Sequence, residues 1–490
     1  MVDTQHLLSD EQMKKYLVDG CLPLKSSLPA EVHQRIYQRT EEVFAQNGNP
    51  GNNLLPQVPE ISKIFDDPVV SGALTSILGP DYVMHSHRHP HINNVGSQGG
   101  GWHKDSYWGF GKVRSHRTRW AMIFYYPQDT HLENGPTAVL PGSHCFEQRA
   151  ENEAEETPLP IAGEAGSMAL VHFDLWHRAM PNQADYTRYM MKFQFVRMRE
   201  PTEPTWNAQG GAWQAQDGPF LSARHWDWHS GGGALGGGNG RSVAELVGEL
   251  DASDPVVRLQ ACSALGFKGA AAVPALEGLA ARLRDGKEPV RLNAAYALSA
   301  VGTAAVPVLR EALGDEMEEA RLAAAHGLAQ AGAVAVPALV EALESEQESE
   351  CGHAAFALGD MGPVGGAEAV GAVARLADDP SEWVRRSAVE ALGTMESDPQ
   401  TAVPVLCTLL ADEDGQTRYE AAYSLARLGA DAADAVPALQ AALHDEKNRY
   451  VGAHSATALH RIGTPAAHKA LLDYLNKMRW CPMTTKESTF

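Results

Sequence analysis

Residues 291–302 have the sequence RLNAAYALSAVG, and related stretches return through the second half of the chain at a period of about 33 residues. Small and apolar residues at i, i+3, i+4 and i+7 of this stretch predict a helix with one buried stripe. Gly302 is expected to end that helix, and Pro307 suits the first turn of the next one. Each repeat therefore predicts a pair of helices, marked by Ala, Ser or Gly before a leucine at Leu265, Leu298, Leu328, Leu358, Leu392, Leu425 and Leu459.

Seven such pairs predict an all-α solenoid over residues 241–478, with residues 241–250 as a lone capping helix. The Arg-x-x-Ala-x-x-Ala-Leu core and the Val-Pro after it resemble HEAT-like repeats. Cys351 and Gly452 replace the repeat arginine in the fourth and seventh units, so different packing is expected there. The other five units keep it, at Arg258, Arg291, Arg321, Arg385 and Arg418. Such arrays present long curved surfaces, so we expect a protein partner or self-association through the repeats.

A glycine-rich stretch, SGGGALGGGNG at residues 230–240, separates the repeats from a first half rich in aromatic residues, prolines and short alternating runs. This composition is typical of a flexible linker. We therefore expect a multidomain protein. Its parts are a domain over residues 1–229, the linker 230–240, the solenoid 241–478 and a C-terminal tail 479–490.

Bulk composition narrows the class of protein. The formal net charge of -21, from 61 acidic and 40 basic residues, argues against nucleic acid as the main partner. No apolar run approaches the roughly 20 residues that span a bilayer, and the first residues do not resemble a signal peptide. No two of the six cysteines have C-x-x-C spacing, so we expect reduced thiols and a cytoplasmic protein. Together with the charge and the lack of a long apolar run, this predicts a protein without membrane or nucleic-acid partners.

Three residues of the first half have the chemistry of an iron site. His103 and Asp105 are two positions apart, so on a strand they point the same way and can bind one metal ion while Lys104 faces elsewhere. His177 lies downstream and is expected to arrive from another strand. Two imidazoles and one carboxylate are the ligands of non-haem Fe(II) oxygenases, and they leave positions open for a chelating keto acid and O2. Arg188, in the β-like run TRYMMKFQFV, can pair with the distal carboxylate of 2-oxoglutarate.

The first 200 residues resemble the phytanoyl-CoA dioxygenase family. The resemblance rests on residues 102–105 (WHKD), on residues 133–144 (ENGPTAVLPGSH) and on the spacing from His177 to Arg188. It implies a double-stranded β-helix, a jelly-roll barrel with flanking helices. It also implies that His103, Asp105 and His177 bind the iron and are catalytic. By the same resemblance Arg188 and Asn93 contact the 2-oxoglutarate, and Trp120 lines the pocket, whereas Ala179 replaces a hydroxyl residue common in the family.

The resemblance implies Fe(II), 2-oxoglutarate and O2 as cofactor and co-substrates, with release of succinate and CO2. Because Asp105 keeps the carboxylate that related halogenases lack, hydroxylation of a small molecule is favoured, with desaturation or ring formation as variants. Two alternatives stay open: a HEAT-repeat scaffold with a vestigial oxygenase domain, and an oxygenase acting on a protein that the repeats present.

Four alternating histidines precede the iron motif, in the run VMHSHRHPHINN. On a strand they share one face, and they either enter the pocket to recognise a polar substrate or form a partly exposed, hydrogen-bonded strand. They are His85, His87, His89 and His91.

Overall fold

The computed structural model describes residues 4–105, 113–149, 157–237, 240–445 and 447–477, so the expected tail at residues 479–490 lies outside the described residues. The chain divides into two compact units. The first comprises residues 1–109 and 114–237, and the second comprises residues 110–113 and 238–490. The described part of the expected linker packs on the first unit: Trp213 and Ala234 are joined by a backbone hydrogen bond, and Gly236 donates back to Trp213. The first unit therefore extends to Gly237, beyond the expected end at residue 229.

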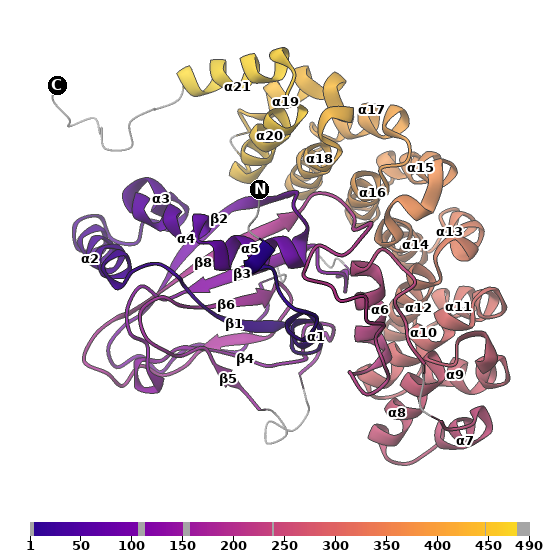
Figure 1. Ribbon diagram of the computed structural model, residues 1–490. Helices are drawn as coiled ribbons and strands as arrows, with labels where there is room; N and C mark the ends of the chain where they lie inside the picture. Colours follow the sequence, from indigo (N-terminus) through magenta and orange to yellow (C-terminus); the bar gives the residue numbers. More distant parts are fainter. Residues whose placement is uncertain (1–3, 106–112, 150–156, 238–239, 446, 478–490) are drawn as a thin grey trace. The chain divides into compact units, whose positions relative to one another are not determined.

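Two antiparallel sheets build the first unit (Figure 1). The larger has the order β1-β6-β3-β8-β2 and the smaller the order β5-β4-β7. The strands are β1 (Cys21–Lys25), β2 (Tyr82–Asn93), β3 (Trp120–Tyr125), β4 (Thr137–Val139), β5 (Leu159–Pro160), β6 (Ser167–His172), β7 (His177–Ala179) and β8 (Arg188–Arg197). This is the expected double-stranded β-helix.

The core of the first unit lies between the two sheets. Met122 and Phe124 of β3, Val171 of β6 and Met190 of β8 face Val139 of β4 in one buried cluster. Alternate residues of β8 point to the same side, so the even-numbered residues after Arg188 share the inner face with Met190. That alternation places several polar side chains inside an otherwise apolar barrel.

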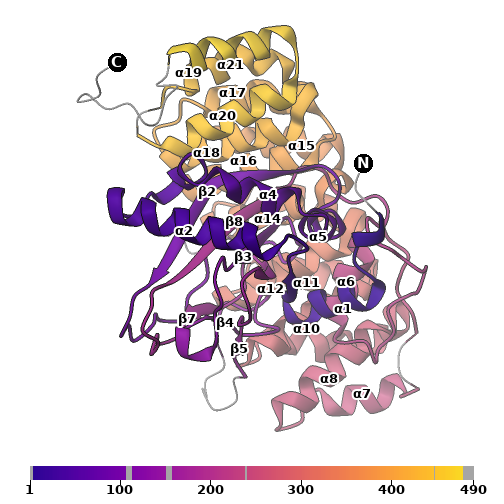
Figure 2. The ribbon, with the colours of Figure 1, turned by 60° about the vertical axis from the view of Figure 1, so that its left-hand side comes forward.

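Helices cover the outer face of the larger sheet (Figure 2). Phe65 of α4 packs on Phe193 and Phe195 of β8, with ring centroids 4.7 and 5.8 Å apart. The capping box expected at Ser9 is present, with Gln12 as its partner. The α-helices of the first unit are α1 (Asp10–Asp19), α2 (Ala30–Asn47), α3 (Leu54–Gln57), α4 (Ser62–Asp66), α5 (Pro68–Leu78) and α6 (Phe220–His229).

The second unit is the expected solenoid of seven helix pairs after a single helix. Gly302 follows the last residue of α10 and Pro307 stands in the first turn of α11, as the sequence predicts. The helices are α7 (Val243–Glu249), α8 (Pro255–Gly266), α9 (Leu276–Arg282), α10 (Glu288–Val301), α11 (Val306–Leu313), α12 (Glu318–Ala331), α13 (Val336–Ala342), α14 (Glu348–Met361), α15 (Gly366–Ala374), α16 (Glu382–Met395), α17 (Pro399–Leu409), α18 (Gly415–Leu428), α19 (Val436–Ala442), α20 (Arg449–Ile462) and α21 (Pro465–Lys477).

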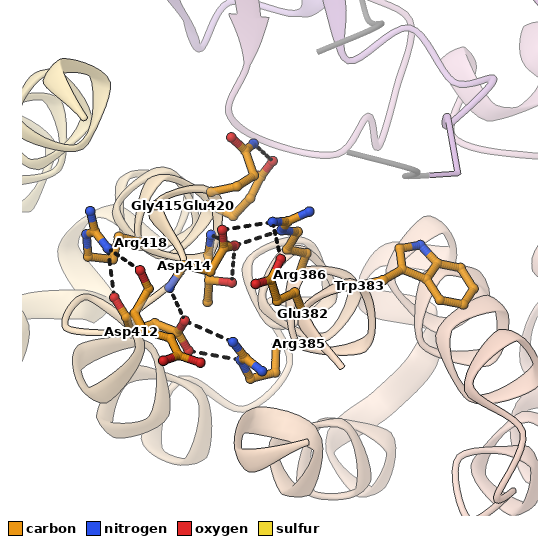
Figure 3. A network of polar contacts seen from close by, with 12 residues as sticks. Glu382, Trp383, Arg385, Arg386, Asp412, Asp414, Gly415, Arg418 and Glu420 are labelled. Carbon is orange, nitrogen blue, oxygen red and sulfur yellow. Dashed lines mark hydrogen bonds and ion pairs between the residues drawn. The ribbon is translucent and has the colours of Figure 1, made fainter. Parts of the chain in front are cut away.

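The repeated arginine has the same contact in each unit that keeps it. Its Nη1 donates to the carbonyl oxygen of the residue six positions earlier, which ties the start of each inner helix to the loop before it. In the fifth and sixth units these contacts form a chain, seen in Figure 3: Arg385 binds the side chain of Asp412, and the carbonyl of Asp412 accepts from Arg418. In the fourth unit, Cys351 instead donates its thiol to the carbonyl of Leu343.

One stretch of the solenoid, Glu318–Ala342, is long and apolar enough by composition to cross a membrane. It consists of two helices of one repeat, α12 and α13, joined by a short 3-10 segment. About half of its apolar window (56%) is buried inside the protein. It is therefore core of the repeat array.

Candidate active site

His103 and His177 lie side by side on neighbouring extended segments. Their backbones exchange two hydrogen bonds of 3.0 and 2.9 Å, and their ring centroids are 4.3 Å apart. His177 begins β7, which pairs with Val139 of β4. The expected strand around His103 is only this single antiparallel bridge, because the chain turns at Asp105. Lys104 points elsewhere, and its ammonium donates to the carbonyl of Phe146 at 2.6 Å.

Asp105 completes the group, because its carboxylate and both imidazoles offer ligand atoms within 4.8 Å of one another. Nε2 of His177 lies 3.8 Å from Oδ1 of Asp105. The buried Lys192 of β8 donates to both carboxylate oxygens at 2.7 Å. Burial alone would raise the pKa of Asp105, but Lys192 and His177 bring that pKa below its usual value. Asp105 is therefore an anion near neutral pH.

Both histidines are oriented to offer Nε2 to a metal ion. Nδ1 of His103 lies 3.0 Å from the carbonyl oxygen of Gly101, and Nδ1 of His177 lies 3.0 Å from that of Leu175. A ring that donates Nδ1–H to a carbonyl keeps its lone pair on Nε2, as metal-binding histidines usually do. Burial lowers the pKa of His177 to about 4, so its imidazole is neutral at pH 7. Two imidazoles and one carboxylate fit Fe(II).

Arg188 and Asn93 converge on one carbonyl group. Nε and Nη2 of Arg188 donate to the oxygen of Gly135 at 3.1 and 2.8 Å, and Nδ2 of Asn93 donates to the same oxygen at 3.0 Å. Gly135 has φ +63°, and a Cβ there would lie 2.4 Å from Nδ2 of Asn93, so the position requires glycine. The pairing Asn93–Arg188 in the β2–β8 ladder brings the two side chains together. Their contact with 2-oxoglutarate stays a prediction.

Trp120 is the first residue of β3. The inner residue of β3 that reaches His177 is Phe124, with ring centroids 5.5 Å apart. Trp120 stands four residues earlier on that strand, about 13 Å away at the usual rise. Its ring stacks on Phe173 at 5.0 Å and meets His85 at 5.1 Å. Its predicted place in the wall of the pocket stays a prediction.

The histidine run of β2 lies on the inner face. His91 pairs with Met190 and His89 with Lys192 in the β2–β8 ladder. A bulge between Met84 and Arg88 interrupts the ladder. Nε2 of His91 is buried and has no hydrogen-bond partner among the described residues. Burial lowers the pKa of His91, with Lys192 acting in the same direction.

Lys192 was missed by the sequence reasoning, and His91 was named only as one of four histidines that could enter the pocket. Lys192 is four positions after Arg188, so the period of two in a strand puts both on one face. A lysine inside the buried run TRYMMKFQFV was the available signal. His91 belonged to a run whose position relative to the barrel could not be read from the sequence.

A barrel of two antiparallel sheets with this donor set at one place is the arrangement expected of a non-haem iron oxygenase domain. Residues 16–190 match the family model of phytanoyl-CoA dioxygenase. Residues 243–329, 276–359, 336–426 and 403–480 match the family model of HEAT repeats. The chain therefore contains an Fe(II)- and 2-oxoglutarate-dependent oxygenase domain of the phytanoyl-CoA dioxygenase type, followed by HEAT repeats. Its cofactors are Fe(II), 2-oxoglutarate and O2.

A search of the curated proteins finds no match. Among solved structures, the chain is similar to the nickel complex of the non-haem monooxygenase ThoJ, at 19% identity and a TM-score of 0.32, over 41% of this chain and 84% of that one. It is also similar to SnoK, the α-ketoglutarate-dependent carbocyclase from nogalamycin biosynthesis, at 17% identity and a TM-score of 0.34, over 41% and 88%. EctD from S. alaskensis with 2-oxoglutarate and 5-hydroxyectoine matches at 16% identity and a TM-score of 0.35, over 39% and 77%.

Proposed function

We propose that the first domain hydroxylates a small-molecule substrate and that His103, Asp105 and His177 bind the iron. The observation that carries the proposal is the convergence of these three side chains, with each imidazole held by a backbone carbonyl through Nδ1. Bound iron and 2-oxoglutarate together supply the oxidant that places one oxygen atom of O2 in a C–H bond of the substrate, while the other enters succinate and CO2 is released.

The protein's own groups contribute positioning and charge. Lys192 neutralises Asp105 and holds its carboxylate in place through two hydrogen bonds. Arg188 is the buried cation on the same face of β8, and its guanidinium suits a carboxylate of the co-substrate. Binding of 2-oxoglutarate there requires the guanidinium to share or exchange its contact with Gly135.

The repeats are proposed to bind a protein partner or a second copy of the chain. The alternative of a scaffold with a vestigial oxygenase domain is disfavoured, because loss of function usually removes at least one member of such a donor set. An oxygenase acting on a protein presented by the repeats differs only in its substrate. Measuring succinate formation with small molecules and with a protein extract separates it from the small-molecule proposal.

The test is succinate formation by the full chain reconstituted with Fe(II), 2-oxoglutarate and O2, first alone and then with pools of small molecules. Succinate formation is expected for the wild type and for His468→Ala, a control at an exposed histidine of α21. It is expected to be absent in His177→Ala. Wild-type protein that binds iron but forms no succinate with any pool, and forms it only with a protein extract, would favour the protein-substrate alternative.

A further inference from the structure

A second group of metal-binding side chains lies in the first unit. His116, Cys145 and His225 each offer one ligand atom, and these atoms lie within 4.8 Å of one another. The group shares no residue with the iron triad, and its ligand atoms lie as near to one another as those of the triad, within 4.8 Å. All three residues are at most 6% exposed.

Three separate parts of the fold supply this group. His116 precedes β3, Cys145 follows β4, and His225 lies on α6. Their approach is a tertiary arrangement, because no short sequence motif connects them. Such convergence from distant segments is typical of a site that ties a fold together.

We propose that His116, Cys145 and His225 bind a second metal ion, a divalent cation of the zinc class. A thiolate and two imidazoles are ligands that Zn²⁺ prefers, and hard ions such as Mg²⁺ or Ca²⁺ do not take them. Full burial of the ligands matches a structural site, which is closed to solvent.

His229 is the candidate for a fourth ligand, and its ring nitrogens lie outside the group of atoms that fall within 4.8 Å of one another. It stands one helical turn after His225 on α6, and histidines at i and i+4 on one helix face are a common zinc-binding pair. It is only 1% exposed. Among the residues that the structure describes, neither of its ring nitrogens has a hydrogen-bond partner. A buried imidazole in that condition lacks an interaction that a metal ion would supply.

Acidic side chains pair with two of the basic residues near His116. Arg114 pairs with Glu147 and Asp174, and Arg119 pairs with Glu200. These ion pairs offset part of the positive charge around the site, and the thiolate of Cys145 would supply negative charge within it.

Cys145 differs from the other described cysteines. The others are Cys21, Cys262, Cys351 and Cys407. Among the described residues, none of them is grouped with two other metal-binding side chains. Cys481 lies outside the described residues, so a sulfur–metal signal that persists in Cys481→Ser would report on Cys145.

A metal ion here would also steady the iron motif. Lys104, between His103 and Asp105, donates to the carbonyl of Phe146, the residue after Cys145. The backbone that carries two iron ligands is thus anchored to the segment that carries the thiol. The proposed ion would act on the iron site by positioning alone.

The experiment measures zinc and iron by mass spectrometry in full-length protein after dialysis, and then titrates metal-free protein with Co²⁺. One zinc ion per chain is expected in the wild type and in His103→Ala, and loss of that zinc is expected in Cys145→Ser and His225→Gln. Cys21→Ser, a buried cysteine of the same unit, is the matched control and should retain zinc. Co²⁺ should give the sulfur-to-cobalt charge-transfer absorption of a thiolate ligand.

Unchanged zinc content in Cys145→Ser and His225→Gln would overturn the proposal. So would a wild-type protein that holds no zinc and gives no sulfur-to-cobalt absorption. The wild-type cobalt spectrum decides even if the variants fail to fold, because the iron triad contains no sulfur.

Discussion

Removing the carboxylate of Asp105 should destabilise the first unit as well as abolish iron binding. Lys192 is 3% exposed and its ammonium has both oxygens of Asp105 at 2.7 Å. In Asp105→Ala that ammonium would be buried without its anionic partner. The variant Asp105→Ala/Lys192→Met removes both charges and keeps most of the buried volume.

Loss of one member of a buried ion pair costs about 3–5 kcal/mol, whereas replacing both members with apolar groups is often close to neutral. We therefore expect Asp105→Ala to lose about 3 kcal/mol and the double variant to recover most of it. With a typical urea dependence of about 2 kcal/mol per molar, the single variant should unfold about 1–2 M earlier in urea.

The assay is urea unfolding of the full chain with a chelator present, so that iron does not contribute. Fluorescence of the packed tryptophans Trp206, Trp213 and Trp226 reports on the first unit. Equal stability of Asp105→Ala and wild type would refute the reasoning, and so would a double variant no more stable than Asp105→Ala. Neither variant should bind Fe(II) with wild-type affinity, which separates the stability effect from the chemical one.

Three further predictions concern other parts of the chain. Arg188→Met should weaken 2-oxoglutarate binding by about 10- to 100-fold, the worth of a charge-assisted hydrogen bond, and leave Fe(II) binding intact; an unchanged 2-oxoglutarate titration would contradict it. Arg385→Ala should lower the free energy of unfolding of the repeats by about 2–4 kcal/mol. The double variant Arg385→Ala/Asp412→Ala should lose much less than the sum of the two single losses, because the two side chains form one ion pair. Additive losses in a double-mutant cycle would contradict this. Burial lowers the pKa of His454 to about 3, below its unfolded value of 6.5, so its contribution to stability is present above pH 6.5 and is lost as pH falls toward 3. His454→Phe should remove up to about 1.4 kcal/mol per pH unit from that acid dependence, and equal slopes in urea unfolding between about pH 7 and 4 would contradict the assignment.

The solenoid and the barrel could be predicted because their signals are local or periodic. The small and apolar stripe of residues 291–302 recurs, and Gly302 and Pro307 mark the helix ends where the structure has them. The reason for the repeated arginine was not visible in the sequence. Its contact with the carbonyl six residues earlier depends on the geometry of the loop between repeats.

In the first unit, the sequence could not predict which side chains from distant parts of the chain come together. The sequence predicted that His103, Asp105 and His177 belong together through the spacing of a known motif, and the structure brings them within 4.8 Å. Lys192 reaches Asp105 only because β8 forms the wall opposite the iron motif. The group of His116, Cys145 and His225 has no regular spacing, so the absence of C-x-x-C pairs in the sequence was a poor guide to it.

The most direct test of the central claim is the visible charge-transfer absorption of the Fe(II)–2-oxoglutarate chelate in anaerobic full-length protein. It needs no substrate, and it reports iron and co-substrate at one site. The account predicts this absorption in the wild type and its loss in His103→Ala and His177→Ala. Folded wild-type protein without the absorption, and without measurable binding of Fe(II) or 2-oxoglutarate, would contradict the account and leave the repeats as the functional part of the chain.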